Sequence, residues 1–305
     1  MLKIEDIKTL LVIGAGTLGG QIALQCARHG YEVNLYDISD QALANGMVMI
    51  QGYLRSMLAE GRLSEAESAA VLVRIHPTTD AQAAAAQADL VSESVPEDPQ
   101  LKGRVFAQFN SLCPEHTVFT TNTSSLVPSM FAEATGRPDR FAALHFHTYV
   151  WISNVVDIMP HPGSSPETLD LLEAFALRIG QIPIRLEKEN YGYVFNTMLN
   201  ALLRSATSLA ARKVTTYQNV DRAWMGVMKM PVGPFGIIDA VGLETVWEIT
   251  QYWAGVLNDA ELQQNADFLK TYVDQGWLGF KSGRGFYTYP DPEYASEGFV
   301  RGDVT

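Results

Sequence analysis

The chain has 305 residues, of which 47% are hydrophobic and 18% are charged, and its formal net charge is −12. The length allows two domains with sizeable cores, and the acidic balance argues against nucleic acid as a partner, because an acidic surface repels phosphate backbones. No apolar run reaches about 18 residues, so we expect no membrane span, and the first residues lack a cleavage pattern, so we expect no signal peptide. Cys26 and Cys113 form no CxxC motif, so we expect no disulfides. Together these features predict a cytoplasmic protein.

The first half of the chain alternates short apolar runs with segments of helical length. The strand-like runs lie at 9–13, 32–36, 88–93 and 117–121, with helical patterns between them. Strand, helix and strand at this spacing predict a parallel, doubly wound α/β sheet.

The motif GAGTLG directly follows the first strand-like run and opens a helix. Gly14 permits a tight turn, Gly16 lets the backbone approach a pyrophosphate, and Gly19 allows close packing of helix on strand. Thr17 and Leu18 lie at the helix N-terminus, where amide donors and a partial positive charge favour phosphate. We expect a dinucleotide to bind here; a purely structural glycine turn and FAD are the alternatives.

The second strand-like run ends at Asp37, 23 residues after Gly14. A carboxylate at this place accepts hydrogen bonds from ribose hydroxyls and repels a 2′-phosphate. Because no arginine follows closely, we expect NAD rather than NADP.

Polar side chains follow the third and fourth strand-like runs. Glu97 and Lys102 come after the third, and Asn122 and Ser124 come after the fourth. Doubly wound sheets bind ligands at the carboxyl ends of their strands, so these residues are candidates for ligand contact. A solvated ion pair and helix capping are the alternatives.

The segment HFHTYVWISNVVD begins directly after the strand-like run RFAAL and ends inside a second run, VVDIM. His145 follows the first run, and Asp157 lies twelve residues later in the second, which can return alongside the first. A carboxylate on one imidazole nitrogen sets the tautomer and leaves the other nitrogen free to take a proton, as oxidation of an alcohol by NAD requires. A satisfied sheet-edge histidine and a metal site using His147 are the alternatives; because no third ligand is evident, we expect no metal.

The second half changes character. Residues 193–213 form a long amphipathic helical pattern, and later segments also have helical patterns. We therefore expect a first domain over 1–187, a helical domain over 188–289, and a loose tail over 290–305, which is polar and rich in turn formers.

Seven segments together resemble one family. They are GAGTLGGQIA, ESVPEDPQLK, NTSSL, RFAALHF, GYVFN, GPFGIIDAVGLET and GRGFY, and they occur in the order and spacing of the L-3-hydroxyacyl-CoA dehydrogenase family over roughly residues 8–289. The resemblance implies a Rossmann-like NAD domain, an all-α C-terminal domain that forms a homodimer, and oxidation of 3-hydroxyacyl groups or the reverse reduction.

The resemblance also implies roles for single residues. Ser124 matches the serine that binds the substrate oxygen, His145 matches the catalytic histidine, and Asp157 stands where the family has an orienting glutamate. Asn196 matches the asparagine that holds the substrate. The positions that match the cofactor side are Glu97, Lys102 and Asn122.

The chain departs from the family pattern in four places. The family usually continues its histidine as HFFNP, where this chain has HFHTYVW, and its glutamate is here Asp157. The family's asparagine–arginine pair is here Asn196 and Thr197. The helical stretch MIQGYLRSMLAEGRL, where the family binds CoA with lysines, has only Arg55 and Arg62. These departures argue against a CoA thioester as substrate. The HF…VW…N pattern resembles bacterial diketoreductases, which reduce carbonyls of β,δ-diketo esters without a CoA handle.

We therefore expect an NAD(H)-dependent 3-hydroxyacyl dehydrogenase or β-ketoacyl reductase that acts on a small molecule with His145 as general acid and base. The alternatives are a diketoreductase-type reductase of free β-keto or β,δ-diketo esters and a non-catalytic NAD-binding protein. The joint presence of Ser124, His145, Asp157 and Asn196 favours an enzyme.

Overall fold

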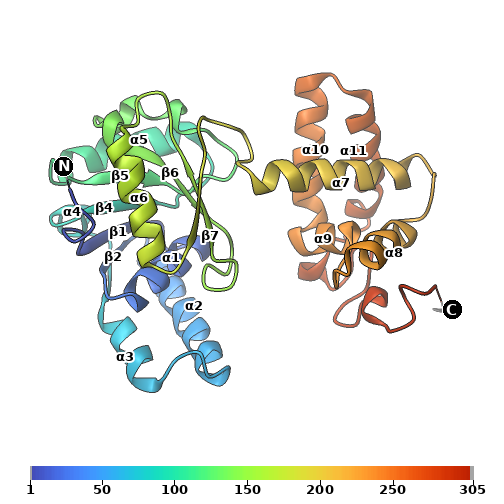
Figure 1. Ribbon diagram of the computed structural model, residues 1–305, viewed down its shortest axis with the longest axis horizontal. Helices are drawn as coiled ribbons and strands as arrows, with labels where there is room; N and C mark the ends of the chain where they lie inside the picture. Colours follow the sequence, from blue (N-terminus) through green and yellow to red (C-terminus); the bar gives the residue numbers. More distant parts are fainter. Residues whose placement is uncertain (1, 303–305) are drawn as a thin grey trace. The chain divides into compact units, whose positions relative to one another are not determined.

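The computed structural model describes residues 2–302 of the chain. By their internal contacts the residues fall into two units, Met1–Val194 and Phe195–Thr305 (Figure 1). No helix in the described part of the chain is long and apolar enough to cross a membrane.

The first unit is built on an eight-stranded sheet with the strand order β3-β2-β1-β4-β5-β6-β7-β8 among the described residues. Every neighbouring pair is parallel except β6 and β7, which are antiparallel. The predicted doubly wound α/β sheet is thus confirmed. The strands are β1 (Thr9–Ile13), β2 (Glu32–Tyr36), β3 (Ile75–Thr78), β4 (Leu90–Glu93), β5 (Val118–Thr121), β6 (Phe141–Phe146), β7 (Val155–Met159) and β8 (Ile182–Arg185).

Helices pack on both faces of this sheet, because alternate side chains of each strand point to opposite faces. In β1, Leu10 and Val12 enter a core with α1, α2 and α6, whereas Leu11 and Ile13 enter a second core with α4 and α5. The helices of this unit are α1 (Thr17–Arg28), α2 (Asp40–Ala59), α3 (Glu65–Val73), α4 (Ala81–Ala85), α5 (Pro99–Leu112) and α6 (Pro166–Arg178).

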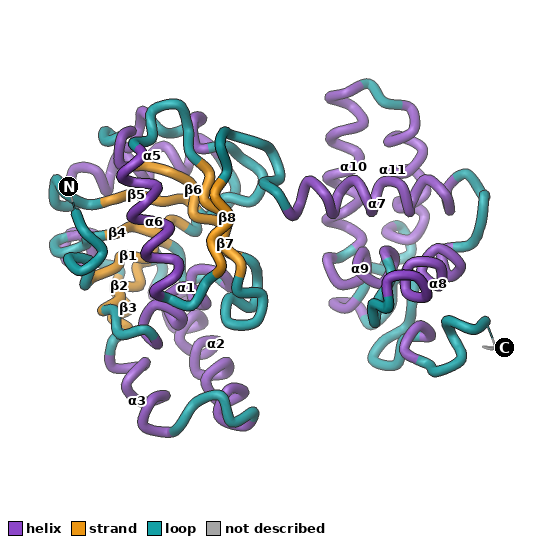
Figure 2. Tube along the Cα trace, viewed as in Figure 1, coloured by secondary structure: helices purple, strands orange, loops and turns teal. Residues whose placement is uncertain are grey.

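The second unit is helical, as Figure 2 shows. Its core gathers aromatic rings, and Phe235 and Phe299 are fully buried in it. The segment expected as a loose tail holds a short 3-10 helix at Glu293–Ala295 and supplies the buried Phe299 ring. The helices are α7 (Phe195–Ala211), α8 (Tyr217–Met228), α9 (Pro234–Val241), α10 (Leu243–Leu257) and α11 (Ala260–Val273).

A buried carboxylate joins three parts of this second unit. Asp221 on α8 accepts hydrogen bonds from the backbone N–H groups of Phe235 (2.8 Å) and Gly236 (3.1 Å), in the first turn of α9, and from the Tyr287 hydroxyl (2.9 Å). Burial raises the pKa of Asp221 to about 6, although these donors act in the opposite direction. Its ionisation is therefore linked to the stability of the unit.

Candidate active site

The polar residues of interest meet at one edge of the sheet. Strands β1, β2, β4, β5 and β6 are parallel, so their carboxyl ends lie along the same edge. The neighbours of β1 are β2 and β4, so the strand order reverses at β1: β2 and β3 extend the sheet on one side, and β4, β5 and β6 extend it on the other. Doubly wound sheets bind ligands at such a point. The glycine motif, which follows β1, therefore lies at that point.

The glycine loop has the backbone that the motif predicts. Gly14 has a φ of +103°, and a Cβ there would lie 2.6 Å from the carbonyl oxygen of Ser94. A Cβ on Gly19 would collide with the carbonyl of Gly14, whereas a Cβ on Gly16 would meet no described atom within 4 Å. Within the described chain no side chain caps α1 at Gly16, so the first amides of α1, which include those of Thr17 and Leu18, suit a phosphate.

Asp37 borders the glycine loop from the end of β2. Its Oδ2 accepts a hydrogen bond from the Ala15 N–H (2.9 Å), and its Oδ1 accepts one from the Ser39 N–H (3.2 Å). A carboxylate and a row of helix-end amides thus lie side by side. This donor and acceptor set fits a dinucleotide, with phosphates on the amides and ribose hydroxyls on the carboxylate.

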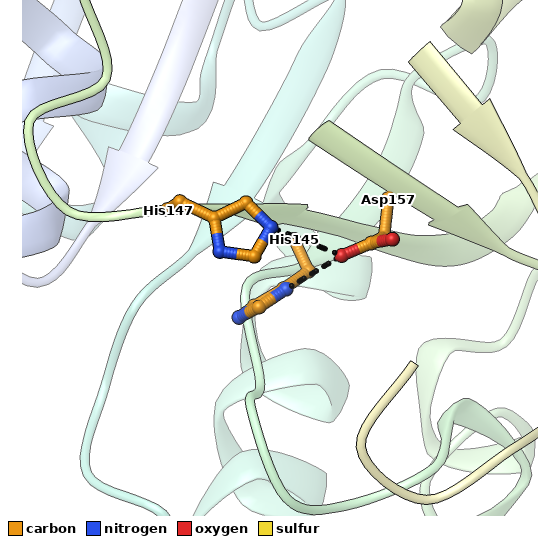
Figure 3. Close-up of side chains that lie close together, drawn as sticks. All are labelled: His145, His147 and Asp157. Carbon is orange, nitrogen blue, oxygen red and sulfur yellow. Dashed lines mark hydrogen bonds and ion pairs between the residues drawn. The ribbon is translucent and has the colours of Figure 1, made fainter. Parts of the chain in front are cut away.

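His145 and Asp157 face each other across the antiparallel pair β6 and β7, where they are register partners. His145 Nδ1 lies 3.2 Å from Asp157 Oδ2, and both side chains are buried (Figure 3). Burial by itself would raise the pKa of Asp157, but hydrogen bonds from His145 and His147 outweigh it and hold that pKa below its ordinary value. The carboxylate is therefore ionised and suited to accept from a protonated Nδ1.

The other ring nitrogen of His145 points to a serine. Nε2 lies 3.1 Å from the Oγ of Ser124, which follows β5 and is exposed. With Nδ1–H directed to Asp157, Nε2 is the nitrogen that can exchange a proton, and it does so on the exposed side. This arrangement of one imidazole between a buried acid and an exposed hydroxyl can carry out general acid–base catalysis.

Glu97 holds the loop that carries Ser124. One carboxylate oxygen, Oε1, accepts the backbone N–H groups of Ser124 and Ser125, both at 2.8 Å, and the Thr123 hydroxyl. Burial would raise the pKa of Glu97, but the charge of Lys102 leads the opposing effects and the pKa lies below its ordinary value. An ionised Glu97 thereby orients the serine that contacts His145.

Lys102 pairs with Glu97, as in the alternative to ligand contact that the sequence left open, but the lysine side of this pair is not solvated. Its side chain is 1% exposed, and Nζ lies 3.2 Å from Glu97 Oε2 and 2.7 Å from Glu93 Oε1. Glu93 was not predicted as a site residue, because a carboxylate at the end of an apolar run shows no partner in the sequence. Lys102 thus has internal partners at the edge where a cofactor contact is expected.

Asn122 and Asn196 complete the predicted set. The Oδ1 of Asn122 accepts the Phe146 N–H at 2.8 Å and so ties the ends of β5 and β6 together. Asn196 lies in the first turn of α7, in the second unit.

Two residues beside His145 were not predicted as partners. The Tyr193 ring stacks on the imidazole, with ring centres 4.4 Å apart and planes 14° apart, and its hydroxyl donates to the Thr123 carbonyl (2.6 Å). His147 Nε2 lies 3.3 Å from the same Asp157 Oδ2 that His145 contacts. The only sequence signals for these contacts are an aromatic residue in GYVFN and a second histidine two positions after the first.

Comparison with known families gives matches over both units. A sequence model described as 3-hydroxyacyl-CoA dehydrogenase, NAD binding domain, matches residues 9–190. A second, described as 3-hydroxyacyl-CoA dehydrogenase, C-terminal domain, matches residues 192–289.

Individual relatives match over almost their whole length. The chain is 31% identical to a probable 3-hydroxybutyryl-CoA dehydrogenase of Bacillus subtilis, over 94% of this chain and 99% of the relative. It is 34% identical to the mitochondrial hydroxyacyl-coenzyme A dehydrogenase of Rattus norvegicus, over 93% and 91%. A solved structure of a diketoreductase that acts on dicarbonyl compounds is 36% identical, with a TM-score of 0.86, over 95% of this chain and 100% of that one.

Proposed function

The chain belongs to the 3-hydroxyacyl-CoA dehydrogenase family and is an NAD-dependent oxidoreductase that acts on CH–OH groups, and we propose that His145 is the acid and base of its reaction. The observation that carries this proposal is the position of the imidazole. One ring nitrogen contacts the buried Asp157 carboxylate and the other contacts the exposed Ser124 hydroxyl. His145 lies at the sheet edge that carries the glycine loop.

The cofactor side of the proposal uses the loop after β1 and the acid after β2. When bound, NAD supplies the hydride acceptor for oxidation or, as NADH, the hydride donor for reduction. The backbone of Gly14, Gly16 and Gly19 and the first amides of α1 would hold the pyrophosphate, and Asp37 would accept from a ribose.

In the oxidation direction, His145 Nε2 takes the proton of the substrate hydroxyl while carbon is oxidised, and in reduction Nε2–H returns that proton to the new alkoxide. Asp157 stabilises the imidazolium through Nδ1, and Ser124 donates a hydrogen bond to the substrate oxygen. General acid–base catalysis of this kind contributes about 10²–10⁴-fold in rate. Tyr193, stacked on the ring, and Glu97, on the serine loop, hold these groups in place.

Asn196 is proposed to hold a second oxygen of the substrate, as the family resemblance implies. A 3-hydroxy or 3-oxo acyl compound has such an oxygen two carbons from the reacting one. Glu97 and Asn122 support the same edge of the sheet. We propose that Glu97, Lys102 and Asn122 lie on the cofactor side of the site, as the family resemblance implies.

A 3-hydroxyacyl-CoA or 3-oxoacyl-CoA is the first candidate substrate, because the family models and the relatives carry that description. Free β-keto or β,δ-diketo esters are a second candidate, which the likeness to the diketoreductase favours. The helix α2 and its following turn offer only Arg55 and Arg62 over residues 49–63, and Arg62 pairs with Glu60 at 2.7 Å. Few cations are therefore available there for CoA phosphates.

The test is NADH oxidation with acetoacetyl-CoA and, in parallel, with a β,δ-diketo ester, by the wild-type chain and by His145→Ala. We expect turnover by the wild-type chain and NADH binding without turnover by the variant. A higher kcat/KM on the thioester supports the first candidate, and a higher value on the free ester supports the second. Wild-type rates in His145→Ala would overturn the role of the imidazole.

We also propose a homodimer and a cytoplasmic location. The second unit exposes large apolar side chains, among them Met198, Tyr252 and Phe280, which suits burial against a second copy. The two cysteines are unpaired and buried, which suits a reducing compartment. Sedimentation analysis and cell fractionation test these two proposals.

A further inference from the structure

The carboxylate of Asp157 is shared by two imidazoles. Its Oδ2 lies 3.2 Å from His145 Nδ1 and 3.3 Å from His147 Nε2, and the two rings stand 5.0 Å apart at 72° (Figure 3). One ligand atom from each of the three residues lies within 4.8 Å of the other two. The third ligand that the sequence did not show for a His145 and His147 metal site is therefore Asp157.

We propose that His145, His147 and Asp157 form a site for a divalent transition ion such as Zn²⁺, and that the bound ion inhibits the enzyme. Two imidazoles and one carboxylate are ligands of the kind that protein zinc sites use, with three protein ligands and one position left for water. The inhibition, though not the binding, rests on the proposed role of His145 as acid and base.

The distances suit such an ion. Zinc binds imidazole nitrogen at about 2.0–2.1 Å and carboxylate oxygen at about 2.0–2.2 Å, so neighbouring ligand atoms of a tetrahedral site lie roughly 3.3–3.5 Å apart. The two nitrogen–oxygen separations here, 3.2 and 3.3 Å, are close to that length. The separation of the two nitrogens, at most 4.8 Å, needs the larger adjustment. His145 and Asp157 lie in strands whereas His147 follows the end of β6, so this adjustment would fall on His147.

The surroundings also suit a metal ligand. A histidine that binds a metal through one nitrogen usually donates a hydrogen bond from the other. With an ion on Nδ1, His145 would donate from Nε2 to the Ser124 Oγ, which already lies 3.1 Å away. Asp157 and His145 are almost fully buried, whereas the His147 side chain is 17% exposed. An ion and its water would enter from the His147 side.

The bound ion would inhibit by setting the wrong tautomer. Coordination of Nδ1 requires that atom to be unprotonated, so the ring proton of neutral His145 stands on Nε2. Nε2 then has no lone pair with which to take the substrate proton. Giving up Nε2–H in the reduction direction would leave a metal-bound imidazolate. The ion thus takes the place of the proton between His145 and Asp157 and blocks proton transfer in both directions.

The experiment uses the untagged full chain. Binding of Zn²⁺ is measured by competition with a chromophoric chelator, and Co²⁺ is used as a spectroscopic probe of imidazole and carboxylate coordination. NADH oxidation is followed at defined free Zn²⁺ and again after EDTA. We expect one ion per chain and inhibition that EDTA reverses. The Co²⁺ spectrum should change in a variant that lacks one of the two imidazoles.

Three variants decide the assignment, and each is compared with its own rate in EDTA. His147→Phe and His147→Gln should weaken both Zn²⁺ affinity and inhibition by at least about tenfold, the loss that even an outer partner of a metal ligand can cause. His116→Asn is the matched control, since His116 Nε2 and Asp89 Oδ1 form a separate pair at 3.0 Å, and it should change neither.

The proposal is overturned if both His147 variants bind Zn²⁺ as the wild-type chain does, or if Zn²⁺ bound at this site leaves turnover unchanged. If the wild-type chain in EDTA turns over neither acetoacetyl-CoA nor the diketo ester, the proposed function fails instead. In that case the Co²⁺ spectra of the wild-type and His147 variants still decide whether the metal site exists.

Discussion

Replacing Asp157 by Asn tests how much of the catalysis depends on the buried carboxylate. The Asp157 Oδ2 and His145 Nδ1 atoms are 3.2 Å apart. At that separation two unit charges attract by about 5 kcal/mol at an effective dielectric constant of about 20. This energy corresponds to slightly less than about 10⁴-fold in rate, and the charge on His145 is only partly developed in the transition state. We expect Asp157→Asn to lower kcat/KM by about 10²–10⁴-fold.

The measurement is steady-state NADH oxidation in EDTA, with the NADH dissociation constant determined by fluorescence. Cofactor binding should stay unchanged, because Asp157 lies on β7 and the glycine loop follows β1. Asp157→Glu is the matched control, since it keeps the charge and adds one methylene, and its loss should be much smaller. If Asn and Glu lower the rate equally, packing and not charge explains the effect. An Asn variant within about threefold of wild type would refute the role of Asp157.

Three further substitutions test the roles of Ser124, Asp37 and Asp221. Ser124→Ala should lower kcat by about 10²-fold, with the NADH dissociation constant unchanged, because it removes a donor to the reacting oxygen. Asp37→Ala should weaken NADH binding by about 10–100-fold, measured by fluorescence, and NADPH binding less, because the lost acceptor also repels a 2′-phosphate. For Asp221 the raised pKa of about 6 means that the folded state binds more protons than the unfolded chain, so its contribution to stability rises as pH falls. Relative to Asp221→Asn, the wild-type free energy of urea unfolding should therefore increase by about 1.3 kcal/mol from about pH 7 to about pH 5. An unchanged difference between the two proteins over that range would show that Asp221 does not titrate there.

The elements that carry the fold could be predicted because their signals are local. The runs at 9–13, 32–36 and 155–159 form strands with the bounds that were expected. A central strand buried on both faces is apolar throughout, and the glycine turn after β1 admits few other structures. The short strand β3 (Ile75–Thr78) was not predicted, because IHPT contains histidine and proline. Its strand conformation depends on its pairing with β2.

The parts of the site that could not be predicted depend on contacts between distant residues. Glu93 ends an apolar strand, and its ionic partner Lys102 comes from the next helix. The stacking of Tyr193 on His145 joins residues 48 positions apart, and no periodicity indicates it. The sequence indicated the pairing of His145 with Asp157 only because two neighbouring apolar runs can form an antiparallel pair of strands. The register that sets them opposite each other comes from the sheet.

Two departures of this chain from the family pattern meet at one oxygen atom. The family's HFFNP has phenylalanine where this chain has His147, and it has glutamate where this chain has Asp157. The shorter acid makes contacts of 3.2 and 3.3 Å to two rings, and both exceed the roughly 2.7–2.9 Å of a strong charged hydrogen bond. Asp157, held at longer range by two imidazoles, can orient His145 and can also accept an ion between the rings. The orienting role and the metal site are therefore consequences of the same shared carboxylate.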